Sequence, residues 1–384
     1  MPQGGLNSAG SFSVFAFAKT LQGAALASGM VGKSMTAGKL KGNFHTHTVF
    51  CDGENTAQEM VEEALARGFT HLGFSGHMDP DIRMDLAAYD AEIRRLQEAY
   101  RGRIDILRGV ELDGLYVPRT RASEAKLACG AEGAGEESGS RTERAGAAES
   151  DSAERAGAAA ESDSAERTGA AESDSAEGKE TADERVLLDG MEYLIGSTHF
   201  IESPSGGPLG SVDDTWERLE AFCREEFSGD YYRLSKEYYR TEAEIFSRTH
   251  CTFVGHFDLV TRFNDERHFL EEDDPRYYMP ALETMEYLVS QGLPLEINCG
   301  AFNRGRKAEL YPNRFLLKNL REMGGEILIS SDAHRRELLD GGFEAAVRTA
   351  ADCGFTHMLF PEHGNGGSIA LREVALDQAD QGPV

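Results

Sequence analysis

Histidine and carboxylate residues stand at spacings that suit metal binding in two distant segments of this chain. The segment NFHTHTVFCDG places His45, His47 and Asp52 within eight positions. Side chains of an extended segment alternate with a period of two, so His45 and His47 point to the same side and can bind one ion. The apolar run EILIS is followed by Asp332 and His334, which repeat the i, i+2 spacing. The two pairs predict a metal site that draws on both segments.

Four further apolar runs lead into a residue that can bind a metal: GFSGH, GVE, IGSTH and TFVGH. In α/β proteins, the carboxyl ends of the strands carry the functional site, so these residues should meet. The candidate ligands are therefore His45, His47, Asp52, His77, Glu111, His199, His256, Asp332 and His334. Six imidazoles and three carboxylates favour Zn, Mn or Fe over Ca or Mg, which prefer oxygen ligands alone.

Any one of these histidines, taken alone, is more often a core or surface residue than a ligand. Their shared position at the ends of successive apolar runs favours a joint site. The other histidines do not share this position, and we expect them to be structural: His71, His250, His268, His357 and His363.

The elements that must position these residues alternate along the chain. Apolar patterns predict strands at 43–48, 70–75, 104–111, 191–198, 252–257, 294–298, 326–331 and 357–360, and helices at 56–67, 85–100, 213–227, 235–248, 280–291, 313–323 and 343–353. Such alternation is typical of parallel strands joined by crossover helices. Without residues 1–40 and 120–185, 278 residues remain. This length is close to the roughly 250 residues of a (β/α) barrel.

Residues 120–185 interrupt this pattern with a low-complexity acidic insertion. Residues 131–184 contain five basic and sixteen acidic residues, and near-repeats of RAGAAESDSAE run from 144 to 177. Because the repeats lack large apolar residues, we expect a disordered segment rather than a packed solenoid. The insertion follows GVELDG at the expected catalytic face, so a lid role is one interpretation. The other is a neutral, expandable insertion, since long surface loops add little closure entropy.

Composition limits the partners and the location of the protein. The formal net charge of -27 argues against a nucleic-acid groove, which needs a basic surface. Residues 1–40 resemble neither an export signal nor a membrane span, because Lys19 interrupts their only mildly apolar run. We expect a disordered extension there, or a true start at Met30 or Met35. The six cysteines show no paired spacing, which predicts reduced thiols in the cytoplasm.

Seven motifs together resemble the polymerase and histidinol phosphatase (PHP) superfamily of metal-dependent phosphoesterases. In chain order they are HTHTxFCDG, GFSGH, GVELDG, IGSTHF, GHFDLVTRF, EINCG and ILISSDAH. Within the superfamily the sequence is most similar to the monofunctional histidinol-phosphatases. The resemblance covers Lys41 to about Phe360 apart from the insertion. It implies a distorted seven-stranded, TIM-like (β/α) barrel over residues 41–365, followed by a C-terminal tail at 366–384.

The resemblance also implies a site for three divalent metal ions and assigns the candidate ligands to them. His45, His47 and Asp332 would bind the first, Glu111 would bridge to a second with His199 and His256, and Asp52, His77 and His334 would bind the third. Asp52 stands where many relatives have a histidine. A carboxylate is a harder ligand than an imidazole, so this position leaves the choice among Zn, Mn and Fe open.

The implied reaction is hydrolysis of L-histidinol phosphate to L-histidinol and phosphate in histidine biosynthesis. Metal ions would neutralise the phosphate and lower the pKa of a bridging water towards about 7. Asp332 is expected to orient or deprotonate that water. Arg262, six residues after His256, is the expected phosphate contact, because a guanidinium suits two phosphate oxygens. The alternative interpretation is that Arg262 forms an ordinary surface ion pair.

A second basic cluster, Arg304, Arg306 and Lys307, follows EINCG at another expected strand end. We take Arg304 as a candidate substrate contact, with a solvated loop as the alternative. Two other functions remain open: a PHP-type phosphoesterase for nucleotides or other small phosphates, and a non-catalytic metal-binding regulatory module. The expected partner is a small phosphate ester, with neither nucleic acid nor membrane, and the oligomeric state is open.

Overall fold

Short parallel strands alternate with helices along residues 40–119, 183–364 and 369–376, the ranges that the computed structural model describes. Seven strands follow the chain order around a nearly closed barrel: β1 (Gly42–Asn43), β2 (His71–Phe74), β4 (Asp105–Asp113), β5 (Tyr193–Ser197), β8 (Phe253–Val254), β9 (Leu295–Asn298) and β10 (Ile327–Ser330). The short β3 (His77–Met78) pairs in parallel with the second half of β4. This is the distorted seven-stranded barrel that the resemblance to the PHP superfamily implies.

The barrel closes between the segments that follow its first and last strands. Thr46 forms an isolated parallel bridge with Ala333, and the His47 backbone N–H donates to the Ala333 carbonyl at 2.9 Å. The predicted strand at 43–48 is therefore regular only over Gly42–Asn43, because the following residues leave the ladder with β2. This closure brings the two i, i+2 motifs of the sequence side by side.

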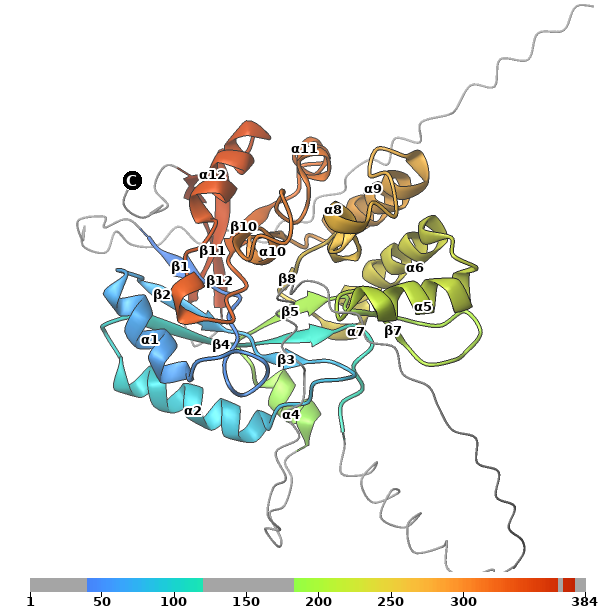
Figure 1. Ribbon diagram of the computed structural model, residues 1–384. Helices are drawn as coiled ribbons and strands as arrows, with labels where there is room; N and C mark the ends of the chain where they lie inside the picture. Colours follow the sequence, from blue (N-terminus) through green and yellow to red (C-terminus); the bar gives the residue numbers. More distant parts are fainter. Residues whose placement is uncertain (1–39, 120–182, 365–368, 377–384) are drawn as a thin grey trace, which may run out of the picture. The chain divides into compact units, whose positions relative to one another are not determined.

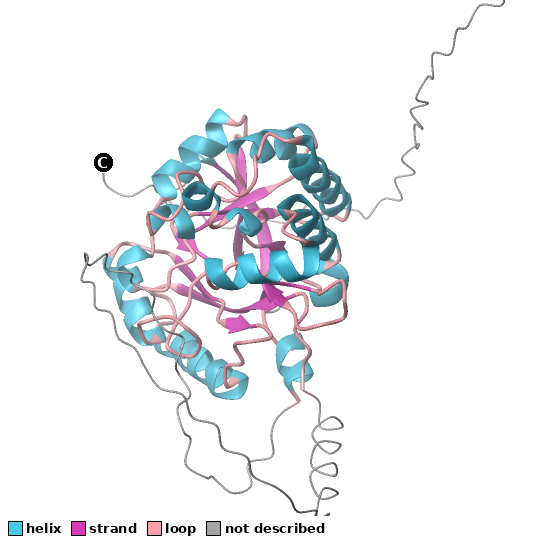
Figure 2. Ribbon diagram, turned by 45° about the vertical axis from the view of Figure 1, so that its right-hand side comes forward, coloured by secondary structure: helices cyan, strands magenta, loops and turns pink. Residues whose placement is uncertain are grey.

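Helices surround the strands (Figures 1 and 2). They are α1 (Ala57–Ala66), α2 (Leu86–Ala99), α4 (Glu184–Asp189), α5 (Trp216–Phe227), α6 (Tyr231–Ala243), α7 (Ile245–Thr249), α8 (Asn264–Arg267), α9 (Pro275–Ser290), α10 (Gly300–Asn303), α11 (Arg314–Glu322) and α12 (Phe343–Asp352), with 3₁₀ turns η1 (Leu259–Thr261) and η2 (Arg336–Leu338). Side-chain caps define many of their starts. Thr56 and Glu59 form a capping box at α1, for example.

Two helices begin earlier than predicted because of such caps. Asp274 caps α9 by accepting from the Arg276 backbone N–H at 2.8 Å, and Pro275 occupies the first helical position, where its missing N–H costs nothing. The helix therefore starts before residue 280. Asp230 likewise caps α6 through two backbone N–H groups, so this helix begins at Tyr231 instead of residue 235.

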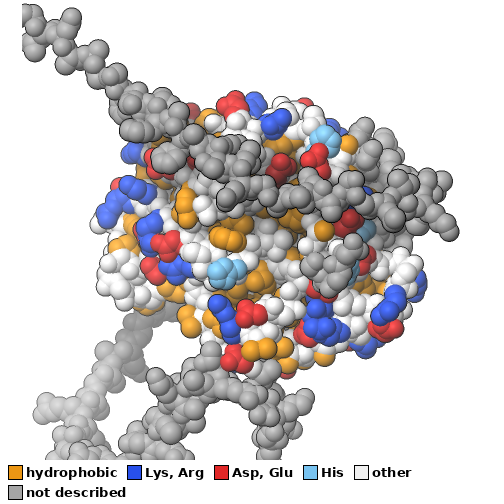
Figure 3. Space-filling view, turned by 180° about the vertical axis from the view of Figure 1, so that it is seen from behind, with side chains coloured by type: hydrophobic (Ala, Val, Ile, Leu, Met, Phe, Trp, Pro, Cys, Tyr) orange, Lys and Arg blue, Asp and Glu red, His pale blue; other side chains and the backbone are white. Residues whose placement is uncertain are grey.

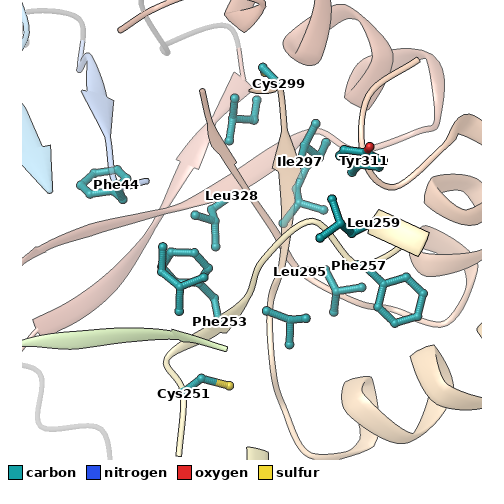
Figure 4. Packing of buried hydrophobic residues seen from close by; sticks show 14 of the residues in the cluster. Phe44, Cys251, Phe253, Phe257, Leu259, Leu295, Ile297, Cys299, Tyr311 and Leu328 are labelled. Carbon is teal, nitrogen blue, oxygen red and sulfur yellow. The ribbon is translucent and has the colours of Figure 1, made fainter. Parts of the chain in front are cut away.

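The barrel interior is filled by aromatic and aliphatic side chains. Figure 4 shows Phe253 from β8 and Leu328 from β10 lying close together. The Tyr193 hydroxyl lies 2.8 Å from the Phe44 carbonyl. A Cβ at Gly109 would lie only 2.3 Å from the Tyr193 ring, so this strand position requires glycine.

The last predicted strand lies outside the barrel. β11 (His357–His363) pairs in antiparallel fashion with β12 (Ile369–Ala375), and the two form a separate two-stranded sheet. β12 lies in the segment that the sequence analysis placed in a C-terminal tail. A second small sheet joins β6 (Phe200–Ile201) and β7 (Gly210–Ser211) after β5.

The two ends of the predicted insertion are held together. The Arg119 backbone N–H donates to Glu184 Oε2 at 2.6 Å, and the Glu184 backbone N–H donates to the Arg119 carbonyl at 3.3 Å. The Tyr116 hydroxyl also donates to Glu184, at 2.6 Å. The predictions for residues 1–39, 120–182 and 377–384 lie outside the described residues.

Several smaller sequence predictions can be compared with the described ranges. Their cysteines are free thiols: Cys51, Cys223, Cys251, Cys299 and Cys353. Within these ranges, no helix combines the length and apolarity of a membrane span. Basic and acidic side chains are interspersed on the face seen in Figure 3.

Candidate metal centre

All nine candidate ligands meet at the carboxyl ends of the barrel strands. His45, His47 and Asp52 come from the segment after β1, His77 from β3, Glu111 from β4, His199 from the residues after β5, His256 from those after β8, and Asp332 and His334 from the segment after β10. Parallel strands in chain order turn all these positions toward one end of the barrel. All but Asp52 and His334 are buried.

Glu111 lies at the centre of this group. Its carboxylate has five imidazole nitrogens within 3.6 Å: His45 Nε2 at 3.1 Å, His47 Nε2 at 3.6 Å, His77 Nδ1 at 2.9 Å, His199 Nε2 at 3.4 Å and His256 Nε2 at 2.9 Å. Ser197 Oγ also donates to Glu111 Oε1, at 2.6 Å. One carboxylate cannot satisfy five imidazoles as hydrogen-bond donors, so the arrangement is suited to shared cations.

Asp52 is the centre of a second group at the rim. Asp52 Oδ2 lies 3.2 Å from His334 Nε2, and Asp52 Oδ1 lies 3.7 Å from His77 Nε2 and 3.8 Å from His47 Nδ1. The imidazole rings of His47 and His334 stack with their centroids 4.1 Å apart. The predicted association of Asp52, His77 and His334 is therefore present as a cluster, with His47 as a fourth member.

Donor atoms come within 4.8 Å of one another in three sets: His45, His47 and Glu111; His77, Glu111 and His199; and His47, Asp52, His77 and His334. His77 thus belongs to two sets, whereas the sequence analysis gave it to the third metal only. Asp332 and His256 flank the sets. Asp332 Oδ1 lies 3.1 Å from His47 Nε2.

The donor atoms of this cluster fit divalent cations. His45 Nε2, His47 Nε2, Asp52 Oδ1, His77 Nδ1 and Glu111 Oε2 are buried and have no hydrogen-bond partner among the described residues. Buried polar atoms nearly always form a hydrogen bond, unless an ion or a water molecule takes the place of that partner. Imidazole nitrogens and carboxylate oxygens are the donors that Zn, Mn and Fe accept.

The carboxylates and imidazoles strongly shift one another's pKa. Burial by itself raises the pKa of Glu111, but His45, His77 and His199 hold it well below its usual value. Against the lowering effect of burial, Glu111 raises the pKa of His77 to about 9. Burial and two neighbouring imidazoles lower the pKa of His47 to about 3. A bound cation would displace the protons that these carboxylates hold on the imidazoles.

Two buried carboxylates that the sequence analysis missed support the histidines. Glu296 Oε1 lies 2.9 Å from His45 Nδ1, and Glu296 Oε2 accepts from the His256 backbone N–H at 3.0 Å. Asp113 Oδ2 accepts from the His199 backbone N–H at 2.7 Å. Carboxylates behind metal-binding histidines fix the ring orientation and increase its basicity. The sequence feature that could have identified Glu296 is its charge, which stands alone inside an apolar strand.

The backbone around Asp332 is shaped for close approach. Asp332 has a φ of 50°, a left-handed conformation that aspartate tolerates better than most residues. A Cβ at Gly300 would lie 2.5 Å from Asp332 Oδ2 and 3.0 Å from Arg304 Nη2, so glycine is required there. Burial alone raises the pKa of Asp332, but His45 and Arg304 hold it well below its usual value.

Arg304 lies at the edge of the cluster. Arg304 Nη1 donates to the Asp332 carbonyl at 3.1 Å and lies 3.3 Å from His334 Nδ1. Arg262, directly after η1, is only 17% exposed, and its Nη1 lies 3.7 Å from Asp213 Oδ2. Burial, Arg262 and Arg304 lower the pKa of Arg306, so the three guanidinium groups gather in one region.

The sequence is similar to a known protein family and to two named proteins. A PHP domain model matches residues 43–300. A protein named probable histidinol-phosphatase in Schizosaccharomyces pombe is 25% identical over 49% of this chain and 59% of its own length, less than two thirds of that relative. One with the same name in Deinococcus radiodurans is 26% identical over 81% of this chain and 92% of its own length.

One solved structure shares the fold at a TM-score above 0.5, and a second is reported beside it. The putative histidinol phosphatase hisK from Listeria monocytogenes gives a TM-score of 0.54 at 17% identity, covering 79% of this chain and 99% of that protein. A histidinol phosphate phosphatase from Lactococcus lactis in complex with zinc, L-histidinol and phosphate gives a TM-score of 0.46 at 18% identity, covering 86% of this chain and 98% of that protein. Since the PHP domain model spans more than half of the sequence, this chain belongs to the PHP domain family.

Proposed function

We propose that this protein is a metal-dependent phosphomonoesterase that hydrolyses L-histidinol phosphate to L-histidinol and phosphate in histidine biosynthesis. The observation that carries the proposal is the nine-residue cluster around Glu111, several of whose buried donor atoms have no hydrogen-bond partner among the described residues, with Arg304 at its edge. The two relatives named probable histidinol-phosphatase support the choice of substrate.

We assign three divalent ions, drawn from Zn, Mn and Fe, to the cluster. The proposed ligands are His45, His47, Asp52, His77, Glu111, His199, His256, Asp332 and His334. When bound, such ions neutralise phosphate charge and make a water molecule a better nucleophile at neutral pH. Glu111 is the proposed shared ligand, because its two oxygens face imidazoles from several strands.

The residues around the cluster have separate tasks in the proposed reaction. Asp332 orients the attacking water by accepting a hydrogen bond from it. Arg262 and Arg304 bind the phosphoryl oxygens and hold the phosphorus in line with that water. Arg304 is already fixed by its contact with the Asp332 carbonyl, so a phosphate that it binds lies beside the water-orienting carboxylate.

The first test is phosphate release by the metal-loaded protein from L-histidinol phosphate and from a panel of nucleotides and sugar phosphates. We expect the highest kcat/KM for L-histidinol phosphate. Faster turnover of another ester would reassign the substrate within the phosphoesterases. Absence of turnover with every phosphomonoester would overturn the enzymatic proposal in favour of a binding module.

Arg262→Ala tests the phosphate contact. Loss of a charge-assisted hydrogen bond should raise KM about tenfold or more while the bound metal stays unchanged. Kinetics and metal analysis on the same sample separate the two effects. Arg94→Ala is the matched control, because the Arg94 side chain is 55% exposed and forms an ion pair with Asp90 on α2, away from the cluster. Unchanged kinetics in Arg262→Ala would remove this residue from the site.

A further inference from the structure

Lys307 is a buried cation in the loop that also carries Arg304. Its side chain is only 2% exposed. Lys307 Nζ donates to Thr261 Oγ1 at 2.9 Å and lies 3.4 Å from the Thr261 carbonyl. Thr261 directly precedes Arg262. The ammonium group is thus turned away from solvent and connects the loop of Arg304 to the loop of Arg262.

Acidic residues from the neighbouring segments surround this cation. Lys307 Nζ lies 3.6 Å from both Asp265 Oδ1 and Glu272 Oε1. Asp265 Oδ2 also accepts from the Ala308 backbone N–H at 2.7 Å. A buried charge is strongly unfavourable unless such partners compensate it. The lysine and its carboxylates therefore form a fixed link between residues 261–272 and residues 304–308.

Further hydrogen bonds extend the link toward α11. Asp258 Oδ2 accepts from the Asn313 backbone N–H at 3.1 Å, and Asn313 Nδ2 donates to Glu272 Oε2 at 2.9 Å. The Tyr311 ring, which lies near Leu259 in Figure 4, has Lys307 Nζ 5.5 Å from its centroid. The whole 304–313 segment is thus attached to the segment that contains η1.

The two linked loops present the arginines that we assign to phosphate. Arg304 Nε and Arg262 Nε are both buried and lack a hydrogen-bond partner within the described part of the chain. The Tyr311 hydroxyl, also buried and unpartnered among those residues, lies close enough to both guanidinium groups for them to act on its pKa. A group that fixes the distance between the two loops therefore also fixes the distance between two phosphate-binding groups.

We propose that Lys307 is a positioning residue for phosphate binding, which holds the loop of Arg262 against the loop of Arg304 so that both guanidinium groups reach one phosphoryl group. This inference rests on the proposed phosphatase function. Lys307 itself does not touch the substrate, because Thr261, Asp265 and Glu272 occupy its surroundings.

The test is the binding of inorganic phosphate to the metal-loaded full chain, measured by calorimetry. Lys307→Met keeps the length of the side chain and removes its charge. We expect about tenfold weaker phosphate binding and a similar rise in KM, because displaced positioning groups cost this much or more. Metal content should stay unchanged. Wild-type affinity in Lys307→Met would overturn the inference.

A double-mutant cycle shows whether Lys307 acts through Arg262. If it does, Lys307→Met should weaken phosphate binding much less in an Arg262→Ala background than in the wild type. Fully additive effects would overturn the positioning role. Should Lys307→Met fail to fold, Thr261→Val removes the main acceptor of the lysine, and the same non-additivity with Arg262→Ala is expected.

Lys41→Met is the control for a purely structural effect. Lys41 is also buried, and its Nζ lies 2.8 Å from Asp340 Oδ2 and donates to the Arg67 carbonyl at 3.2 Å. This variant should lower the thermal stability without changing phosphate affinity. A wild-type protein that neither binds nor releases phosphate would refute the proposed function. A functional wild type with an unaffected Lys307→Met would refute this inference alone.

Discussion

At the carboxyl ends of the barrel strands one glutamate faces five imidazoles, whereas at the amino ends histidines and carboxylates pair almost one to one. There, His363 Nδ1 lies 2.6 Å from Asp105 Oδ1 and His363 Nε2 lies 3.3 Å from Glu192 Oε1, while His71 Nε2 lies 3.6 Å from Asp105 Oδ2. Residue types are the same at both ends. Buried ligand atoms without a hydrogen-bond partner among the described residues thus distinguish a candidate metal site from an ion-pair cluster better than the presence of histidine does.

The most damaging change should be Glu111→Gln. It removes the charge that all five imidazoles share, so activity should fall more than about a hundredfold and the protein should lose metal. Phosphate release measures the activity, and metal analysis measures the loss of metal. Asp105→Asn is the matched change at the amino end and should leave turnover and metal content near wild type. Equal losses in the two variants would abolish the distinction between the ends.

Glu296→Gln should have a smaller effect. The amide still fills the space but holds His45 Nδ1 less strongly, so metal affinity should fall about ten- to a hundredfold. Competition with a chelator measures this affinity directly. Excess metal should restore most of the activity, because the ligands themselves remain. A variant with wild-type metal affinity would show that Glu296 only fills the barrel.

The smallest effect is expected for His363→Gln, and it should depend on pH. Burial lowers the pKa of His363, but Asp105 and Glu192 outweigh it and raise the pKa above its usual value. The protonated form is thus favoured by folding. Its contribution to the free energy of unfolding is complete below the unfolded pKa of about 6.5 and is lost as the pH rises through the folded pKa. Because the ring is 30% exposed, we expect the ion pairs of His363 to contribute about 0.5 kcal/mol to the free energy of unfolding.

Thermal unfolding of wild type and His363→Gln at pH 6.5 and pH 9 measures this contribution. The difference in Tm should be larger at pH 6.5. Burial lowers the pKa of His71 to about 4, so this neighbour stays neutral in that range and does not obscure the result. A larger difference at pH 9 would contradict the assignment of His363 as an ion-pair partner.

The sequence predicted the carboxyl-end cluster because ligand-type residues followed apolar runs, and a parallel barrel brings the ends of such runs together. It did not predict that His77 faces both Glu111 and Asp52, since this depends on the side-chain direction at β3. Glu296 was missed because the run around it is otherwise apolar. Only its distance to His45 Nδ1 reveals its role.

Tertiary partners explain the other differences. Arg304 and Lys307 lie three positions apart in one basic cluster of the sequence. Arg304 reaches Asp332, whereas Lys307 is buried against carboxylates from other segments, which the local sequence does not show. The strand at 357–360 was predicted, but its partner β12 comes from a segment with a weak apolar pattern, so its pairing was missed.

The hydrogen bonds between Arg119 and Glu184 make this position a permissive insertion point. The chain leaves and re-enters the barrel through two residues that bond directly to each other, so these bonds hold the two ends of the insertion together. Replacement of residues 121–181 by a short flexible linker, or by a reporter domain with adjacent termini, should therefore leave the barrel intact. We expect such replacements to leave the cluster around Glu111 unaltered.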